Sequence, residues 1–340
     1  MTINEKKILI LKNDRIGDLL VSINAINRIL NKHSNEKITI FLSKINHKFG
    51  FFFKDVDKKI LNFDLNLFEK LKIFFYFLIN SVDTAYILTP KNFYFYLPLF
   101  FKKTKFYGLT IKSKKNRPNE YLKSKLFQYV TLDRINLKKR LSSYQVQENL
   151  IEKTENSKNL INVNEKINHN FKLPKKYLFF HYKHKLFNEL LEWDFKQIEI
   201  LFDLLSKNCE NLVFSSDINA PKINKYFIQK FNHFDFINKN EIKVNNKNIY
   251  YLHEIDGYNL FDTVNNSSKV ICPEGIISHL GYFCKKDTTA LLHFNINNRG
   301  NLIDQLISCK EWFPPNNYKF CVLKKDFYQS LNKLNKRISN

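Results

Sequence analysis

The amino-acid sequence predicts an α/β protein with two Rossmann-like domains. Short apolar segments typical of buried strands alternate with segments of helical period, and this alternation is typical of βαβ units and parallel sheets. It occurs in two series, which a long polar segment separates. The length of 340 residues agrees with two domains, since one domain takes roughly 100–200 residues.

The first series fills residues 1–152, which we expect to form the N-terminal domain. It opens with residues 7–12 (KILILK), a run apolar enough for a strand that is covered on both faces. A turn leads into residues 18–31, where apolar side chains recur at helical spacing. The other predicted elements are strands at 37–42, 60–63, 84–88 and 105–108 and helices at 68–80 and 144–152.

The second series fills residues 177–340, the expected C-terminal domain, and follows a polar linker at 153–176. Its predicted elements are strands at 177–181, 211–215, 249–252, 269–272 and 288–292 and helices at 193–208, 221–231, 260–266 and 277–283. We expect the last helix of the chain to pack back on the N-terminal domain. Because open parallel sheets bind ligands at the carboxyl ends of their strands, we also expect the two sheets to face a central cleft.

The chain is strongly basic, with a formal net charge of 55 − 32 = +23. Such a charge favours anionic partners: nucleic acid, nucleotides, phosphorylated sugars or an anionic membrane surface. The competing interpretation is compositional drift, because lysines are scattered over the whole chain and Lys, Asn, Ile, Phe and Tyr are abundant throughout. The charge alone leaves both interpretations open.

The five cysteines lack any Cys-x-x-Cys spacing, so we expect reduced thiols rather than a disulfide framework or a zinc site. The opening segment does not read as a signal peptide, since its apolar run at 8–11 is short and flanked by charges. No window reaches the ~18–20 apolar residues of a spanning helix. We therefore expect a cytoplasmic protein.

The first segment with candidate chemistry is residues 13–18 (NDRIGD), between a predicted buried strand and a helix. Gly17 permits a tight turn and close approach of a ligand to the backbone. Asp18 falls in the first turn of the helix, where a carboxylate can cap the helix or act as a general base. A purely structural N-cap is the competing interpretation.

The second segment is residues 272–280 (CPEGIISHL), again a strand, a turn and a helix. Ser278 and His279 fall near the start of the helix, where backbone N–H groups and the helix dipole favour a phosphate. Glu274 is placed to accept hydrogen bonds from ribose or sugar hydroxyls. The alternative is a capping cluster in which His279 faces the core.

Two further segments carry weaker signals. Residues 180–185 (FHYKHK) place Lys183 and Lys185 after the first strand of the C-terminal domain, where they can meet a diphosphate. In a chain so rich in lysine, the composition favours the competing interpretation, a solvated loop. Residues 256–260 (DGYNL) are interpreted either as a turn near the rim of the cleft or as a simple loop.

Motifs for several other chemistries are absent. The sequence contains no Gly-x-x-x-x-Gly-Lys phosphate loop, no Gly-x-Gly-x-x-Gly, no Gly-x-Ser-x-Gly elbow and no His-Glu-x-x-His. No Asp-x-Asp pair follows a predicted strand, which is where metal-dependent sugar transferases commonly hold a divalent ion. We therefore expect a mechanism without a metal ion or other cofactor.

Five segments in order resemble the family 9 glycosyltransferases, which include the heptosyltransferases. Residues 8–30 are similar to the family's opening strand, Arg-Ile-Gly-Asp turn and helix. Residues 144–150 (YQVQENL), Trp193, residues 252–260 and residues 273–280 are similar to its later elements. The ordered matches extend from residue 8 to about residue 293 and so cover nearly the whole chain.

This resemblance implies a GT-B fold and inversion at the anomeric carbon without a metal ion. It implies that the N-terminal domain binds the acceptor, with Asp18 matching the catalytic aspartate and Asp14, Arg15 and Gly17 beside it on the acceptor side. The C-terminal domain would bind a nucleotide-sugar, ADP-heptose first, through its donor-binding candidates: Lys183, Lys185, Glu274, Gly275, Ser278 and His279. The implied acceptor is the lipopolysaccharide core or another surface glycan, an anionic glycolipid at the inner face of the inner membrane.

Two departures from the family pattern concern the donor. Glu274 stands where the family usually has Asp, and Leu191 stands where it has a lysine, two positions before the tryptophan that Trp193 matches. Lys183 or Lys185 is the candidate replacement for that lysine. Two other hypotheses stay open: a sugar-nucleotide epimerase of the same architecture, and a non-catalytic nucleic-acid-binding protein, although no motif for specific nucleic-acid binding occurs.

The aromatic stretch 93–103 (FYFYLPLFFKK) has two interpretations. It can rest on a membrane surface with its lysines beside it, or it can form a buried helix of the first domain.

Overall fold

The computed structural model describes residues 5–338, apart from 54, 114–116, 137–140, 152–172, 218, 237–239, 242–247, 295–305, 307–308, 310 and 315–318. Residues 153–172 of the expected linker therefore lie outside the described residues. Contacts within the chain divide it into two compact units. Unit 1 comprises Met1–Asn162 and Ile303–Pro315, and unit 2 comprises Val163–Leu302 and Asn316–Asn340.

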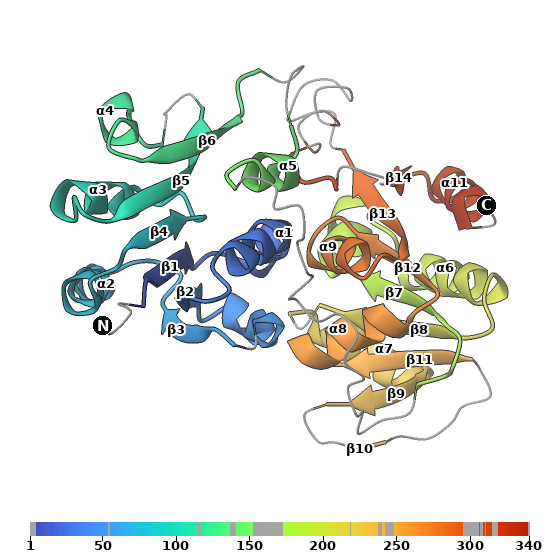
Figure 1. Ribbon diagram of the computed structural model, residues 1–340. Helices are drawn as coiled ribbons and strands as arrows, with labels where there is room; N and C mark the ends of the chain where they lie inside the picture. Colours follow the sequence, from blue (N-terminus) through green and yellow to red (C-terminus); the bar gives the residue numbers. More distant parts are fainter. Residues whose placement is uncertain are drawn as a thin grey trace. The chain divides into compact units, whose positions relative to one another are not determined.

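Unit 1 is built on a parallel sheet, which in the described residues has six strands in the order β3-β2-β1-β4-β5-β6 (Figure 1). This is the strand order of a dinucleotide-binding Rossmann sheet. The strands are β1 (Lys7–Lys12), β2 (Lys37–Ser43), β3 (Asp57–Leu61), β4 (Thr84–Ile87), β5 (Lys105–Lys112) and β6 (Gln128–Asp133).

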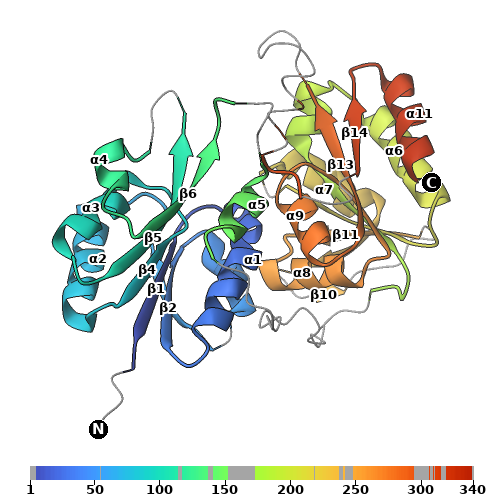
Figure 2. The ribbon, with the colours of Figure 1, turned by 45° about the horizontal axis from the view of Figure 1, so that its top comes forward.

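The helices of unit 1 cover both faces of this sheet. In Figures 1 and 2, α2, α3 and α4 lie on one face and α1 and α5 on the other. Their bounds are α1 (Ile16–Lys32), the 3₁₀ helix η1 (Asn46–Phe52), α2 (Leu67–Asn80), α3 (Asn92–Phe100), α4 (Glu120–Lys123) and α5 (Ser143–Glu148). Helix α1 buries the apolar residues whose spacing predicted it, including Leu19, Ile23 and Ile26.

Unit 2 has an eight-stranded sheet in the described residues, ordered β10-β9-β11-β8-β7-β12-β13-β14. All neighbouring strands are parallel except β9 and β10. The strands are β7 (Leu178–Tyr182), β8 (Leu212–Ser216), β9 (Asn232–Asp235), β10 (Asn240–Glu241), β11 (Ile249–His253), β12 (Lys269–Pro273), β13 (Asp287–His293) and β14 (Lys319–Leu323).

The helices of unit 2 are the π-helix η2 (Lys185–Leu190), α6 (Phe195–Lys207), α7 (Pro221–Lys230), α8 (Gly257–Asn266), α9 (Ile276–Phe283) and α11 (Phe327–Ile338). Their apolar faces pack into a core rich in aromatic rings. For example, the Phe202 and Phe214 rings lie 4.6 Å apart and the Phe214 and Phe227 rings 5.0 Å apart, both edge to face. Aromatic rings and Leu and Ile side chains share this core, so the phenylalanines of this part of the chain contribute directly to the buried apolar layer.

The prediction of two Rossmann-like α/β units is confirmed, and three details differ from expectation. The expected strand at 60–63 is β3, which runs from Asp57 to Leu61 at the sheet edge, where most of its side chains are exposed. The last helix, expected to pack on the N-terminal domain, buries Phe327, Leu334 and Ile338 in the core of unit 2. Residues 303–315, expected in the C-terminal domain, belong to unit 1.

The strand order fixes where each unit is open to a ligand. In unit 1 the chain turns to opposite sides of the sheet after β1 and after β4, and in unit 2 after β7 and after β12. Ligands of open α/β sheets bind at such switch points, beyond the carboxyl ends of the strands. Within the described residues, no helix is both long and apolar enough to cross a membrane.

Candidate active site

The turn from β1 to α1 carries the first predicted segment, at the switch point of unit 1. Arg15 is the N-cap of α1 but gives it no side-chain hydrogen bond, and its guanidinium is exposed, 5.9 Å from the centre of the Phe63 ring. Asp18 lies in the first turn of α1 and is half-buried. Gly17 sits between them in the same turn. The four predicted residues of this segment therefore lie at one edge of the sheet.

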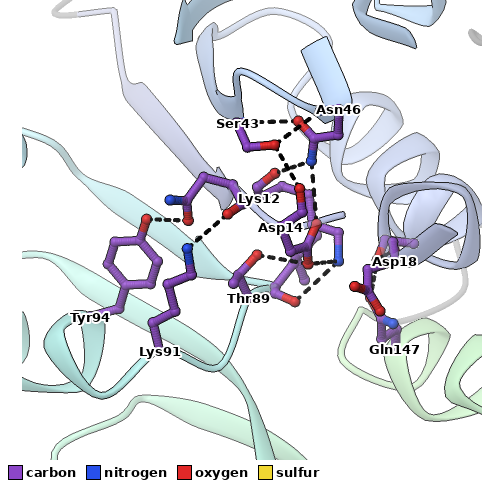
Figure 3. Close-up of polar contacts among 12 residues, drawn as sticks. Lys12, Asp14, Asp18, Ser43, Asn46, Thr89, Lys91, Tyr94 and Gln147 are labelled. Atoms are coloured by element: carbon purple, nitrogen blue, oxygen red, sulfur yellow. Dashed lines mark hydrogen bonds and ion pairs between the residues drawn. The ribbon is translucent and has the colours of Figure 1, made fainter. Parts of the chain in front are cut away.

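Asp14 is the structural member of this group. It is 7% exposed, and its Oδ2 accepts from Lys12 Nζ at 2.7 Å and from Thr89 Oγ1 at 2.9 Å (Figure 3). Its backbone oxygen accepts from Ser43 Oγ at 2.6 Å. Burial raises the pKa of the Asp14 carboxyl; Lys12 offsets part of that rise, and the nearby Asp18 carboxylate adds to it. Both carboxylate oxygens and the backbone oxygen of Asp14 accept from protein donors, so Asp14 holds the turn in shape.

Asp18 differs from Asp14 because its carboxylate has no hydrogen bond or ion pair within the described part of the chain. Ser22 Oγ donates to the backbone oxygen of Asp18 at 2.8 Å and also contacts Gln147 Oε1, which places the Gln147 amide beside this turn (Figure 3). A carboxylate that is half-buried and unpaired is available to take a proton from a bound hydroxyl.

Asp18 borders a pocket of about 410 Å³ whose lining belongs entirely to unit 1. The pocket is bordered by the ends of β1 and β4, by β5 and by the segment around Trp312. The cations in its lining are Lys12, Arg15, Lys91, Arg117 and Arg134. The carboxylate thus lies in a basic recess of a size that suits one or two sugar rings, or a similarly small anionic group.

The cations of this pocket are not equivalent. The guanidinium of Arg134 is held by both oxygens of the buried Glu311, at 2.5–3.1 Å. Lys91 donates to the backbone oxygens of Asn13, at 2.9 Å, and Phe63, and burial lowers its pKa. Arg117 is exposed, and its guanidinium makes no hydrogen bond or ion pair with the described residues. Arg117 is therefore free to bind an anion.

The switch point of unit 2 carries a second, larger pocket of about 660 Å³. It is bordered by the turn after β7, which supplies Lys183 and Lys185, and by the turn after β12, which supplies Glu274 and Gly275. Burial raises the pKa of the Glu274 carboxyl, and the Lys183 ammonium opposes that rise. The four predicted residues therefore border one cavity. They include one acid, Glu274, and two cations, Lys183 and Lys185, from loops that are 89 residues apart in sequence (274 − 185).

Ser278 and His279 do not line this cavity with their side chains. Ser278 Oγ accepts from the Gly275 N–H at 3.2 Å and donates to the Gly275 oxygen at 2.8 Å, so it caps α9. His279 is 5% exposed, and burial lowers its pKa to about 4. The capping alternative thus describes these two side chains.

The backbone of the same turn remains suited to an anion. The first intrahelical donor of α9 is His279 N–H, which bonds to the Gly275 oxygen at 3.2 Å. The N–H groups of residues 276–278 precede it in the first turn, where a helix leaves its donors without intrahelical partners. Gly275 has a φ of 144°, a conformation that side chains disfavour, and an added Cβ would meet nothing within 4 Å.

Several residues of the second pocket were not predicted from sequence. His181 Nδ1 lies 2.9 Å from Ser215 Oγ, and its Nε2 lies 3.7 Å from the Asp217 carboxylate. Asp217 also accepts from the His184 N–H at 3.1 Å, and these contacts lower its pKa against the effect of burial. Ile255 and Leu260 add to the apolar wall. The segment 256–260, expected to be a turn or a simple loop, is instead the start of α8, with Asp256 as its N-cap.

The two residues of the tryptophan element lie in the core rather than at the pocket. Leu191 is 1% exposed and Trp193 is 2% exposed, and the Trp193 ring contacts Phe187 and Phe327. Leu191 therefore supplies no charge to this pocket. The lysines that border it are Lys183 and Lys185. Among the described residues, no group of three or more His, Cys, Asp or Glu is placed to hold a metal ion.

Two Rossmann-like units, each with a pocket at its switch point, define a fold of the GT-B type. Solved structures confirm the fold. The glycosyl transferase family 9 protein of Veillonella parvula DSM 2008 is similar at a TM-score of 0.61 and 13% identity, with 99% of this chain and 91% of that chain covered. ADP-heptose lps heptosyltransferase II of E. coli is similar at a TM-score of 0.63 and 11% identity, with 98% of each chain covered.

The same fold occurs in enzymes of another reaction class. A UDP-GlcNAc 2-epimerase from Neisseria meningitidis, solved bound to UDP-GlcNAc, is similar at a TM-score of 0.53 and 11% identity, with 98% of this chain and 91% of that chain covered. By sequence alone, neither a family model nor a curated protein matches the chain. At such low identity the structural likeness establishes the fold, and the chemistry has to be argued from the site.

Proposed function

We propose that this protein is an inverting, metal-independent glycosyltransferase that uses a nucleotide-sugar. The observation that carries the proposal is the difference between the two switch points. One presents an unpaired carboxylate, Asp18, in a basic recess, and the other presents cations and free helix N–H donors around a larger cavity. A base on one unit and a diphosphate site on the other are the two requirements of direct sugar transfer.

In the proposed reaction the acceptor binds in the pocket of unit 1 with one hydroxyl against the Asp18 carboxylate. Asp18 takes the hydroxyl proton while the oxygen attacks the anomeric carbon of the donor sugar from the side opposite the diphosphate. A new C–O bond forms, the C–O bond to the diphosphate breaks, and the configuration inverts. The nucleotide diphosphate leaves with the bonding electrons.

The donor lies in the pocket of unit 2 in this proposal. The first-turn N–H groups of α9 and the ammonium groups of Lys183 and Lys185 offset the charge that develops on the diphosphate as the bond breaks. Glu274 accepts hydrogen bonds from hydroxyls of the donor, which its carboxylate can do while ionised. These are the roles that a transferase without a metal ion must assign to its own residues.

We propose heptose as the first donor sugar and the lipopolysaccharide core, or another surface glycan, as the acceptor. The likeness of the fold to an ADP-heptose heptosyltransferase supports the donor. The unpaired Arg117 and the other cations of the unit 1 pocket support an anionic acceptor. An acceptor of this kind is carried by lipid, so we also propose that the protein works at the inner face of a membrane, in peripheral contact with it.

The test is a donor screen with ADP-, GDP-, UDP- and dTDP-sugars, by thermal shift and by release of nucleotide diphosphate, with and without EDTA. We expect one donor to stabilise both wild type and Asp18→Asn. Only wild type should release the diphosphate at full rate when acceptor glycolipid is added, with a loss of roughly 10²–10⁴-fold in the variant. Asp203→Asn, which replaces an exposed aspartate on α6 outside both pockets, is the matched control and should keep full activity.

Other outcomes decide between the alternatives. Isomerisation of the donor sugar with no acceptor present would identify the epimerase reaction instead. Loss of activity in EDTA would contradict the metal-independent mechanism. If no sugar nucleotide shifts the melting temperature and nucleic acid binds in a salt-dependent manner, the transferase proposal fails.

A further inference from the structure

Helix α2 has two apolar faces, and only one of them is used by the fold. Ile73 and Phe77 are buried in the core of unit 1. A second set of large apolar side chains is exposed, with Phe68 at 70% and Ile79 at 78%. We call this second set the α2 apolar face: Leu67, Phe68, Leu71, Phe75, Leu78 and Ile79.

The spacing of these residues makes one continuous surface. At about 100° per residue, the α2 apolar face occupies an arc of about 120°, opposite the arc that contains Ile73 and Phe77. A helix with one apolar face is normal for a globular protein, whereas a second apolar face of this length is a patch that marks an interaction site.

The exposed surface continues onto the end of α3. The Phe74 ring lies 5.6 Å from the Phe100 ring and 5.0 Å from the Phe101 ring, so the two helices meet there. Phe100 itself is 65% exposed. The rest of α3 is largely buried, including Tyr94 and Phe95, so the buried interpretation applies to most of the stretch 93–103 and its exposed end adds to the α2 surface.

Lysines border this surface, whereas the acid of α2 is turned away from it. On the helical arc, Lys70 and Lys72 lie on opposite sides of the α2 apolar face, and Lys102 and Lys103, both exposed, follow Phe100. The one acid within α2, Glu69, is 5% exposed and accepts from Asn62 Nδ2 at 2.9 Å on the buried side. An apolar strip between lysines is the arrangement of helices that lie in the interface of an anionic bilayer.

We propose that the α2 apolar face docks the protein onto the surface of an anionic lipid membrane. Phe68, Phe75 and Ile79 enter the boundary between headgroups and acyl chains, while the flanking lysines meet lipid phosphates. This inference rests on the proposed function in one respect: the lipid-carried acceptor is the reason why the protein would bind a membrane. The surface itself is independent of that reaction.

Charge argues against a second copy of this chain as the occupant. In a two-fold dimer the same patch contacts itself, so Lys70, Lys72, Lys102 and Lys103 would face each other. No acid on the helix is exposed to pair with them. Like charges at an interface oppose association, whereas anionic lipid neutralises them.

The experiment is flotation of the full chain with vesicles of phosphatidylcholine alone and of equal parts phosphatidylcholine and phosphatidylglycerol. We expect wild type to float with the anionic vesicles and to be released by high salt. Phe68→Gln/Phe75→Gln/Ile79→Gln should bind at least tenfold more weakly, and Lys70→Gln/Lys72→Gln should bind weaker by about fivefold per lysine. Tyr328→Gln, which replaces an equally exposed aromatic residue (69%) on α11, is the matched control and should bind like wild type.

Three other outcomes overturn the docking surface, and a fourth overturns the transferase instead. Equal flotation of wild type and the triple variant would place lipid binding elsewhere. A wild type that is dimeric and does not float, with a monomeric triple variant, would assign the face to a second copy. The thermal shift with the donor is measured on the same samples. If wild type binds the donor but not vesicles, only the membrane-docking proposal fails. If wild type binds vesicles but no nucleotide-sugar, only the transferase proposal fails.

Discussion

The ammonium of Lys12 lies 2.7 Å from the carboxylate of Asp14, and the two residues are 2% and 7% exposed. This buried ion pair closes the end of β1, directly beside the turn that presents Asp18. Burial raises the pKa of Asp14 in spite of Lys12. The pair therefore matters for the shape of the site more than for its net charge.

Removing one partner of this pair should destabilise the protein unequally. Asp14→Asn leaves the Lys12 ammonium buried without a counter-charge, so the free energy of unfolding should fall by about 3–5 kcal/mol. Lys12→Met should cost less, because Asp14 can take up a proton and still accept from Thr89 and Asn46. Denaturant unfolding of both single variants and the double variant measures this, and simple additivity of the two single effects would contradict the coupling.

Arg117 should determine acceptor affinity. Its guanidinium has no partner among the described residues and lines the pocket of Asp18. Arg117→Gln should raise the KM for an anionic acceptor roughly tenfold, the loss of one charge-assisted hydrogen bond, and leave the donor affinity unchanged. Arg134→Gln is the comparison: it breaks the contact with the buried Glu311 and should lower the melting temperature. An unchanged KM in Arg117→Gln would remove Arg117 from the acceptor site.

The affinity for the donor should fall as the pH falls. This fall should begin at a pH above the usual titration range of a glutamate. Burial raises the pKa of Glu274 from 4.5, so its carboxylate is protonated and lost as an acceptor earlier in an acid titration. Lys183→Gln removes the cation that opposes this rise, so the weakening should move to still higher pH. Calorimetric titration with the nucleotide-sugar measures it, and Glu274→Gln should abolish the pH step. A step that persists in Glu274→Gln would assign it to another group.

His279 should make unit 2 sensitive to acid. Burial lowers its pKa from 6.5 to about 4, so between these values the unfolded chain binds a proton that the folded chain does not. The free energy of unfolding should therefore fall as the pH falls from 6.5 to about 4, by up to about 1.4 kcal/mol per pH unit. His279→Gln should flatten this part of the profile in denaturant unfolding. His47→Gln, at an exposed position, is the matched control, and an equal slope in all three proteins would contradict the prediction.

The sequence predicted most helices and strands because their burial follows the sheet layers. Strands such as β1 are covered on both faces and read as continuous apolar runs. The edge strand β3 was placed too late because Lys58 and Lys59 belong to it, and an exposed edge strand has no apolar run to mark its start. The strands β6, β9 and β14 were not predicted, because their side chains are only partly buried and give no continuous apolar run.

The candidate site was predictable where the chain order alone brings residues to a strand end. Asp18 lies in the first turn of the helix after β1, and Glu274 directly follows β12. Asp217 directly follows β8, so the same argument could have found it. Arg117 and Arg134 were out of reach, because their position in the pocket depends on how β5 and β6 pair and on Glu311, far along the chain. For Ser278 and His279 the sequence located the right turn, and the structure shows that its backbone rather than these side chains is turned to the cavity.

The return of residues 303–315 to unit 1 has a consequence for how the protein is made. Arg134 is clamped by Glu311, and the Glu311 backbone oxygen accepts from the Ser143 N–H at 2.7 Å. On the ribosome, the first 162 residues emerge long before these partners do, and most of unit 2 is synthesised in between. The nascent N-terminal unit therefore lacks part of its pocket lining until these residues are synthesised. A fragment that ends at the boundary between the units would lack that part of the lining permanently.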